Sequence, residues 1–154
     1  MKRFESLAIC SIVFLSVGHC LAGESDDTER LVGDWRVVDL IARGKHDSGV
    51  SFRGMRFKLT TETVTTFAGA HTPAGKRRKP PLTQRYTVDN SRSPKHLNLI
   101  FEKKGVSLTM KSIYKIQDGK LHICMGGVDR PTTFDTAETA RGCYIAERET
   151  DENP

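Results

Sequence analysis

Hydrophobic and polar residues alternate with a period of two in several segments of the chain after residue 34. Such alternation is typical of β-strands, because successive side chains of a strand point to opposite faces, one toward a core and one toward water. Many of the apolar positions hold β-branched or aromatic residues, which favour strands. The segments with this pattern are residues 35–41, 55–59, 62–67, 85–88, 96–101, 106–116, 121–125 and 143–146.

Short turns separate the strands expected in the second half of the chain. Lys103-Lys104-Gly105 and Asp118-Gly119 supply residues that accept positive φ, as tight turns between antiparallel strands require. No segment is long enough to form a crossover helix, so neighbouring strands are expected to run antiparallel. Closing such a meander into a barrel removes its edge strands. The pattern therefore predicts an all-β fold, an antiparallel up-and-down barrel of about eight strands with a short N-terminal helix.

A polar lead precedes the strands and a polar tail follows them. Residues 23–30 are mostly polar, and a hydroxyl or carboxylate among residues 25–27 could cap a short helix that runs through Leu31. Residues 31–148 are expected to form one barrel domain, and residues 149–154 a flexible tail. The sequence shows no internal repeat and no second domain.

Residues 1–22 have the organisation of an export signal. A positively charged start precedes an apolar core over residues 7–17, and small residues end the segment at Ala22. The apolar core is too short for a membrane span of ~20 residues, so the protein is not expected to span a membrane. We expect cleavage near Ala22 and export to the periplasm, the cell envelope or the outside of the cell. A buried N-terminal helix and a lipid anchor on Cys20 are the alternatives.

The cysteines fit an exported protein. Removal of residues 1–22 would leave Cys124 and Cys143, and two cysteines in an oxidising compartment can form one disulfide. Alternation groups Cys124 with His122 and Cys143 with Ile145, so the two side chains could lie on different faces of the sheet. The pattern does not decide whether Cys124 and Cys143 form a disulfide.

The charge excludes one class of function. The 24 Lys and Arg exceed the 19 Asp and Glu, for a formal net charge of +5, which is too little over a whole domain to indicate nucleic-acid binding. The basic residues cluster once, followed by two prolines. This cluster could contact an anionic component of the cell envelope, but a solvated loop is favoured because no aromatic residues interleave. The cluster consists of Lys76, Arg77, Arg78 and Lys79.

No group of residues indicates catalysis. His122 and Cys124 would share a face of a strand and could ligate a metal ion, but two ligands do not make a site. A nucleophilic Cys124 would need a basic partner within hydrogen-bond reach, and His122 flanks it on the same strand. The sequence therefore predicts no catalytic residue, no metal site and no cofactor, and a protein that is not an enzyme.

Arg130-Pro131 allows two interpretations. Proline fixes φ and removes an amide, which stiffens the chain after Gly126-Gly127. Arg130 could bind a carboxylate or phosphate with both arms of its guanidinium. The favoured interpretation is that it holds a long loop on the barrel by donating hydrogen bonds to backbone carbonyls.

Gly33-Asp34-Trp35, at the start of the first strand, resembles the opening of lipocalin-type barrels. The resemblance implies that Trp35 closes one end of the barrel and is covered by an arginine from the last strand, which would be Arg148. A guanidinium over an indole gains a cation–π contact and covers apolar surface.

A second resemblance narrows the family. "IYKIQDGKLHICM" followed by "RPTTF" is similar to a lipocalin-like domain family of uncharacterised function that is abundant in planctomycete bacteria. The similarity spans about residues 31–148. The chain departs from the family pattern at Ser112, where the family has glycine, and in carrying Cys143. The resemblance implies the fold and no activity.

Two functions stay open. The first is a binding module that holds a small apolar or amphipathic ligand inside the barrel. The second is a solid-core envelope domain that uses its surface, including Lys76–Lys79, to bind an anionic partner. Either is expected to be a monomer. The side chains expected to point inward, where they would line a cavity or fill it, are Phe57, Leu59, Tyr86, Val88, Leu97, Leu99, Leu108, Met110, Leu121 and Ile123.

Overall fold

The structure is a computed structural model that describes residues 26–47, 49, 52–69, 80–137 and 142–150. The expected export signal over residues 1–22 and the Lys76–Lys79 cluster lie outside the described residues, as do residues 151–154 of the expected tail.

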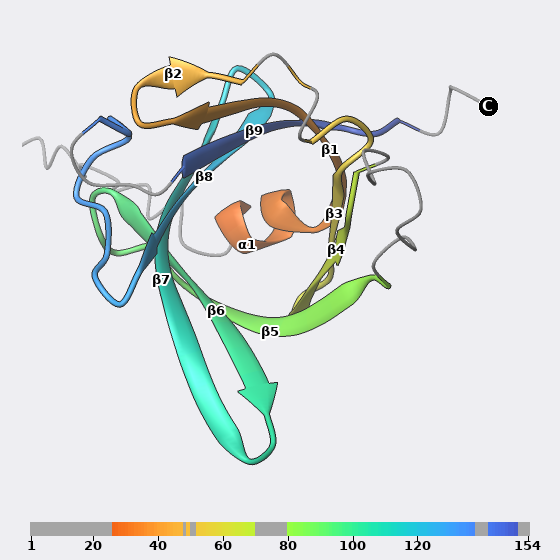
Figure 1. The fold of residues 1–154 in the computed structure, drawn as a ribbon, viewed down its shortest axis with the longest axis vertical. Coiled ribbons are helices and arrows are strands. Elements are labelled where there is room, and N and C mark those ends of the chain that lie inside the picture. Colours follow the sequence, from red (N-terminus) through yellow and green to blue (C-terminus); the bar gives the residue numbers. More distant parts are fainter. Residues whose placement is uncertain (1–25, 48, 50–51, 70–79, 138–141, 151–154) are drawn as a thin grey trace, which may run out of the picture.

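One short helix precedes nine strands (Figure 1). The elements are α1 (Asp26–Leu31), β1 (Gly33–Ala42), β2 (Lys45–His46), β3 (Arg56–Leu59), β4 (Thr63–Phe67), β5 (Leu82–Asp89), β6 (Lys95–Lys103), β7 (Val106–Gln117), β8 (Lys120–Gly127) and β9 (Gly142–Arg148).

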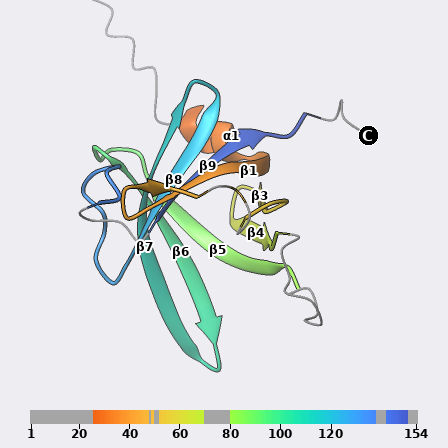
Figure 2. The ribbon, with the colours of Figure 1, turned by 45° about the horizontal axis from the view of Figure 1, so that its top comes forward.

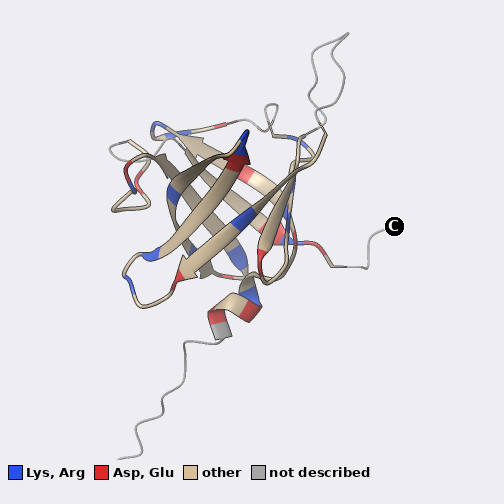
Figure 3. Cartoon of the chain, turned by 90° about the horizontal axis from the view of Figure 1, so that it is seen from below, with Lys and Arg blue, Asp and Glu red and all other residues tan. Residues whose placement is uncertain are grey.

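The sheet is closed and antiparallel throughout. Its strand order is β2-β1-β3-β4-β5-β6-β7-β8-β9, and β1 also pairs with β9. The two-residue strand β2 only folds back on the end of β1. The other eight strands form an up-and-down barrel, which confirms the predicted fold class, and α1 lies across one end of it (Figures 2 and 3).

The tight turns follow from residues with positive φ. Lys104 (φ 50°) with Gly105 (φ 79°) joins β6 to β7, and Asp118 with Gly119 joins β7 to β8 in the same way. Positive φ at both central residues is the turn whose twist matches that of a hairpin. Arg43 (φ 51°), followed by Gly44, makes a third such turn between β1 and β2, which the sequence pattern did not predict.

The core fills the barrel beneath α1. Leu31 of α1 and Trp35 of β1 are buried with residues from the facing strands. Seven of the ten residues expected to point inward belong to this core, namely Phe57, Leu59, Tyr86, Leu97, Leu99, Leu121 and Ile123, while Val88 and Met110 are partly buried against it.

Leu108 is not part of this core, because it is 65% exposed. The β6–β7 hairpin extends beyond the end of the barrel (Figure 1). β6 pairs with β5 only as far as Ile100, and β7 pairs with β8 only from Lys111 onward. Leu108 points to the inner face of the hairpin, as expected, but among the described residues no paired strand continues this far to cover it.

Candidate functional site

The end of the barrel beneath α1 is sealed by Trp35 and Arg148. Trp35 is 1% exposed, and its indole N–H donates a hydrogen bond of 2.9 Å to the carbonyl of Leu31. The guanidinium carbon of Arg148 lies 4.5 Å from the centre of the Trp35 ring. The two residues are direct partners between β1 and β9, so this contact joins the first strand of the barrel to the last.

Arg148 also fixes the helix to this end. It donates hydrogen bonds of 2.7 Å to the carbonyl of Val32 and 2.5 Å to that of Arg30. Gly33 lies directly beneath the guanidinium with φ 141°, and a Cβ there would clash with Arg148 Nη1. The backbone conformation therefore favours glycine at this position, and a larger residue would displace the guanidinium.

At the opposite end, β5, β6, β7 and the end of β8 line a groove of about 520 Å³, which we call the mouth groove. Along β5, Leu82 and Gln84 lie on the same face as Tyr86, which belongs to the core, so the groove continues the inner surface of the barrel. The lining residues are Leu82, Thr83, Gln84, Phe101, Glu102, Lys103, Leu108, Thr109, Met110, Gly127 and Val128.

The mouth groove gathers exposed apolar side chains. Within the described residues, the large hydrophobics with exposed side chains are Leu82 (52%), Leu108 (65%), Val128 (80%) and Val106. The first three line the groove. Apolar side chains scattered singly over a surface are ordinary, whereas a contiguous exposed set is typical of a binding site.

The residues expected to line a cavity thus divide between two places. Leu108 and Met110 line the mouth groove, and the larger residues deeper in the barrel pack against one another as core. The interior beneath the groove is filled by side chains such as Tyr86, Leu97 and Leu99. A ligand would therefore sit at the end of the barrel and not in its centre.

Sequence reasoning missed Gln84. Its side chain is buried, at 7% exposure, and its Nε2 has no hydrogen-bond partner in the described part of the chain. The signal was present in the sequence, because Leu82, Gln84, Tyr86 and Val88 alternate along β5. Gln84 is the polar member of that inward series.

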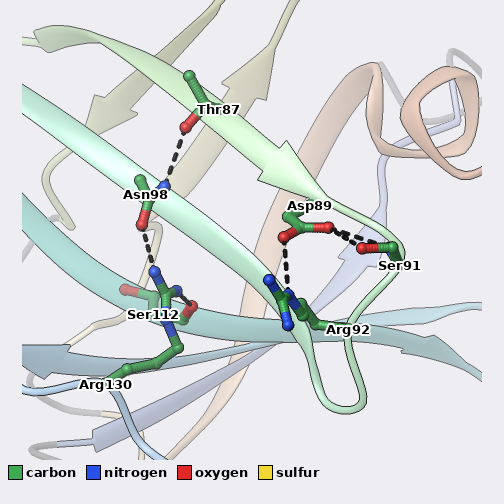
Figure 4. Close-up of polar contacts among 7 residues, drawn as sticks. All are labelled: Thr87, Asp89, Ser91, Arg92, Asn98, Ser112 and Arg130. Atoms are coloured by element: carbon green, nitrogen blue, oxygen red, sulfur yellow. Dashed lines mark hydrogen bonds and ion pairs between the residues drawn. The ribbon is translucent and has the colours of Figure 1, made fainter.

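Arg130 ends a ladder of hydrogen bonds across the outer face of β5, β6 and β7 (Figure 4). Asn98 Nδ2 donates to Thr87 Oγ1 at 3.0 Å, and Arg130 Nη2 donates to Asn98 Oδ1 at 2.6 Å. Arg130 Nη1 donates to the carbonyl of Ser112 and, at 3.4 Å, to that of Leu97. The contacts of Arg130 are those of a residue that holds a loop on the barrel wall.

The loop that carries Arg130 approaches β8 closely. A Cβ at Gly126 would lie 2.6 Å from Pro131 Cδ and would clash with the carbonyl of Asp129. Pro131 is fully buried. Farther along the loop, Phe134 packs on a small second cluster formed by Ile113, Cys124 and Cys143.

Cys124 and Cys143 form a disulfide. They are direct partners between β8 and β9 and both point to the outer face, where Phe134 covers them. Cys124 is therefore unavailable as a nucleophile or as a metal ligand beside His122. Among the residues that the structure describes, no group of three or more His, Cys, Asp or Glu could hold a metal ion.

Replacing Arg130 with lysine is expected to lower the free energy of unfolding by about 1–2 kcal/mol, because an ammonium cannot reach the Ser112 carbonyl and the Asn98 amide in the same planar geometry. Denaturant titration measures the loss. Arg92→Lys is the matched control, since Arg92 makes one exposed contact with Asp89 at 3.2 Å (Figure 4) and its replacement should change stability by less than ~0.5 kcal/mol. Equal losses in the two variants would contradict the role given to Arg130.

Comparisons with known proteins add little to this geometry. No family model matches the chain. A crystal structure of a mutant of the fluorescent protein UnaG is similar, with a TM-score of 0.42 and 15% sequence identity over 80% of this chain and 99% of that chain. In the part of the chain that the structure describes, no helix has the length and apolar character needed to cross a membrane.

Proposed function

We propose that this protein is an exported, non-enzymatic binding module that holds a small apolar or amphipathic ligand in the mouth groove. The observation that carries the proposal is the gathering of Leu82, Leu108 and Val128, all exposed, along one groove. Covering these side chains with an apolar molecule removes their surface from water, which is favourable by roughly 25 cal/mol per Å².

The size of the groove supports a small-molecule ligand. Its volume of about 520 Å³ lies within the range of roughly 300–1,000 Å³ that is usual for such sites. The sealed end beneath α1 leaves the mouth groove as the place where a ligand can reach the inner face of the barrel.

Export and family membership are part of the proposal. Export is supported by the organisation of residues 1–22 and by the Cys124–Cys143 disulfide, since disulfides persist in oxidising compartments. Membership of the lipocalin-like family is supported by the contact of Arg148 with Trp35. Binding of an anionic envelope partner by Lys76–Lys79 stays a prediction from the sequence.

Titration with N-phenyl-1-naphthylamine, an uncharged dye that fluoresces in apolar sites, tests the proposal. The purified protein should bind the dye, and Leu108→Asp should weaken binding at least tenfold, because a carboxylate in the groove opposes apolar contact. Ser107→Asp is the matched control, since Ser107 lies on the same hairpin, does not line the groove and points to the other face. The proposal is overturned if both variants weaken dye binding equally. It is also overturned if the wild type does not bind the dye.

A further inference from the structure

Gln84 differs in burial from the other described residues of the mouth groove. Leu82, Leu108 and Val128 are exposed and Phe101 and Met110 are half-buried, whereas Gln84 is 7% exposed. Its position follows from the strand pairing. β5 and β6 stay paired up to Arg85 opposite Ile100 and part at the next residue, which is Gln84. The side chain therefore lies where the barrel wall opens into the groove.

The amide nitrogen of Gln84 donates no hydrogen bond to any of the described residues. Leaving a buried donor without an acceptor is unfavourable, and such atoms are rare in folded proteins. The other buried polar side chains of the described residues include Asp27, which pairs with Arg30 and Lys95, and Thr136, whose Oγ1 accepts from the Gly44 amide at 2.8 Å.

Ser112 provides a useful comparison. Its Oγ is also buried and without a partner among the described residues. Ser112 lies opposite Leu97, deeper in the barrel than Gln84, and does not line the groove. Of these two unpartnered groups, Gln84 is therefore the one that a molecule in the groove can reach.

The groove is lined by one side chain of each charge, Glu102 and Lys103, and the carboxylate already has a cationic partner in Arg85. Lys103 lines the groove near its rim, and the carboxylate of Glu102 is held by Arg85 at 3.0 Å. An oxygen acceptor on a ligand would thus meet an uncharged donor at the buried side of the groove and a cation at its rim.

We propose that the ligand of the mouth groove is amphipathic, with a carboxylate or similar oxygen acceptor that takes a hydrogen bond from Gln84 Nε2 while its apolar body covers Leu82, Phe101, Leu108 and Met110. This inference rests on the proposed function and adds the chemical class of the ligand. Gln84 sets the orientation of the ligand in the groove and selects ligands that carry a hydrogen-bond acceptor. A purely apolar ligand leaves the donor unpaired and binds less tightly.

Two related dyes test the inference. 1-Anilinonaphthalene-8-sulfonate and N-phenyl-1-naphthylamine share an aromatic body, and only the first carries sulfonate oxygens. Both should bind the wild-type protein, the sulfonate dye more tightly. Gln84→Met keeps the length of the side chain and removes the donor. It should therefore lower the affinity for the sulfonate dye about tenfold and change the affinity for the uncharged dye by less than about twofold.

Ser112→Ala is the matched control, because it removes the other unpartnered polar atom and should leave the affinity for both dyes unchanged. Gln84→Leu is the second variant if Gln84→Met does not give a cooperative thermal transition. If the uncharged dye binds the wild type but Gln84→Met lowers the affinity for both dyes equally, or for neither dye, the role of Gln84 is overturned. The proposed binding function stands in that case. If neither dye binds the wild type, the proposed function fails and this inference fails with it.

Discussion

Replacing Trp35 with alanine is expected to lower the free energy of unfolding by about 3–5 kcal/mol, the usual loss for a large buried aromatic side chain. Trp35 is almost completely buried, and it contacts both α1 through the Leu31 carbonyl and β9 through Arg148. Trp35 stabilises the sealed end and also joins the first strand to the last, so its loss should weaken the closure of the barrel. Denaturant unfolding followed by circular dichroism measures the effect.

Fluorescence of Trp35, the single tryptophan of the chain, tests the geometry without removing it. The native emission should be blue-shifted and poorly quenched by iodide, and Arg148→Ala should increase quenching because the guanidinium covers the ring. Arg36→Ala is the control, since Arg36 is exposed on the same strand and its carboxylate partner, Glu147, is 3.8 Å away. Strong quenching of the wild type, or equal quenching in the two variants, would contradict the sealed end.

Replacing Cys124 and Cys143 together with alanine is expected to lower the free energy of unfolding by about 3 kcal/mol, the value for a disulfide that closes a loop of this length. Because the cystine is covered by Phe134 and lies between β8 and β9, its loss also removes packing from the loop that carries Arg130. The comparison should be made by denaturant titration without reductant, and the reduced wild type should fall near the double variant.

Thiol counting on protein recovered from its native cells tests the bridge and the proposed export together. If residues 1–22 have been removed, the denatured and unreduced protein should contain no free thiol, because Cys124 and Cys143 would be the remaining cysteines. Two reactive thiols in a chain that begins near Gly23 would contradict the disulfide, and a full-length chain would contradict the export.

The strands could be predicted from the sequence because each buries one face on a common core. Alternation at the positions of β3 and β5, for example, follows directly from burial of Phe57, Leu59 and Tyr86. The Arg43-Gly44 turn was not predicted, although it resembles Lys104-Gly105, because the strand that follows it has two residues and shows no alternation.

The candidate site was harder to predict than the fold. Alternation identifies the face to which Leu108 points, but it does not tell how far the neighbouring strands extend, and this decides whether that face is core or groove. Gln84 was visible as a polar residue in an apolar series. Whether Gln84 faces the core or the groove depends on where β5 and β6 separate, and only the structure shows that position.

The face of the sheet on which each cysteine lies could not be predicted from the sequence either. Alternation alone allowed them to lie on opposite faces, because it does not fix the register between β8 and β9. The pairing of β8 with β9 places Cys143 directly opposite Cys124, so the two side chains lie on the same outer face. The outer face is buried there because the loop around Phe134 covers it.

The outer part of the β6–β7 hairpin lies beyond the strands that enclose most of the core. This part, residues 101–110, supplies one wall of the mouth groove, while the barrel strands and the sealed end hold most of the core. Exposed positions on such a segment tolerate substitution with small changes in stability. Under the proposed function, evolution can therefore alter the ligand preference by changing a two-stranded ribbon, while the rest of the barrel keeps its sequence and its stability.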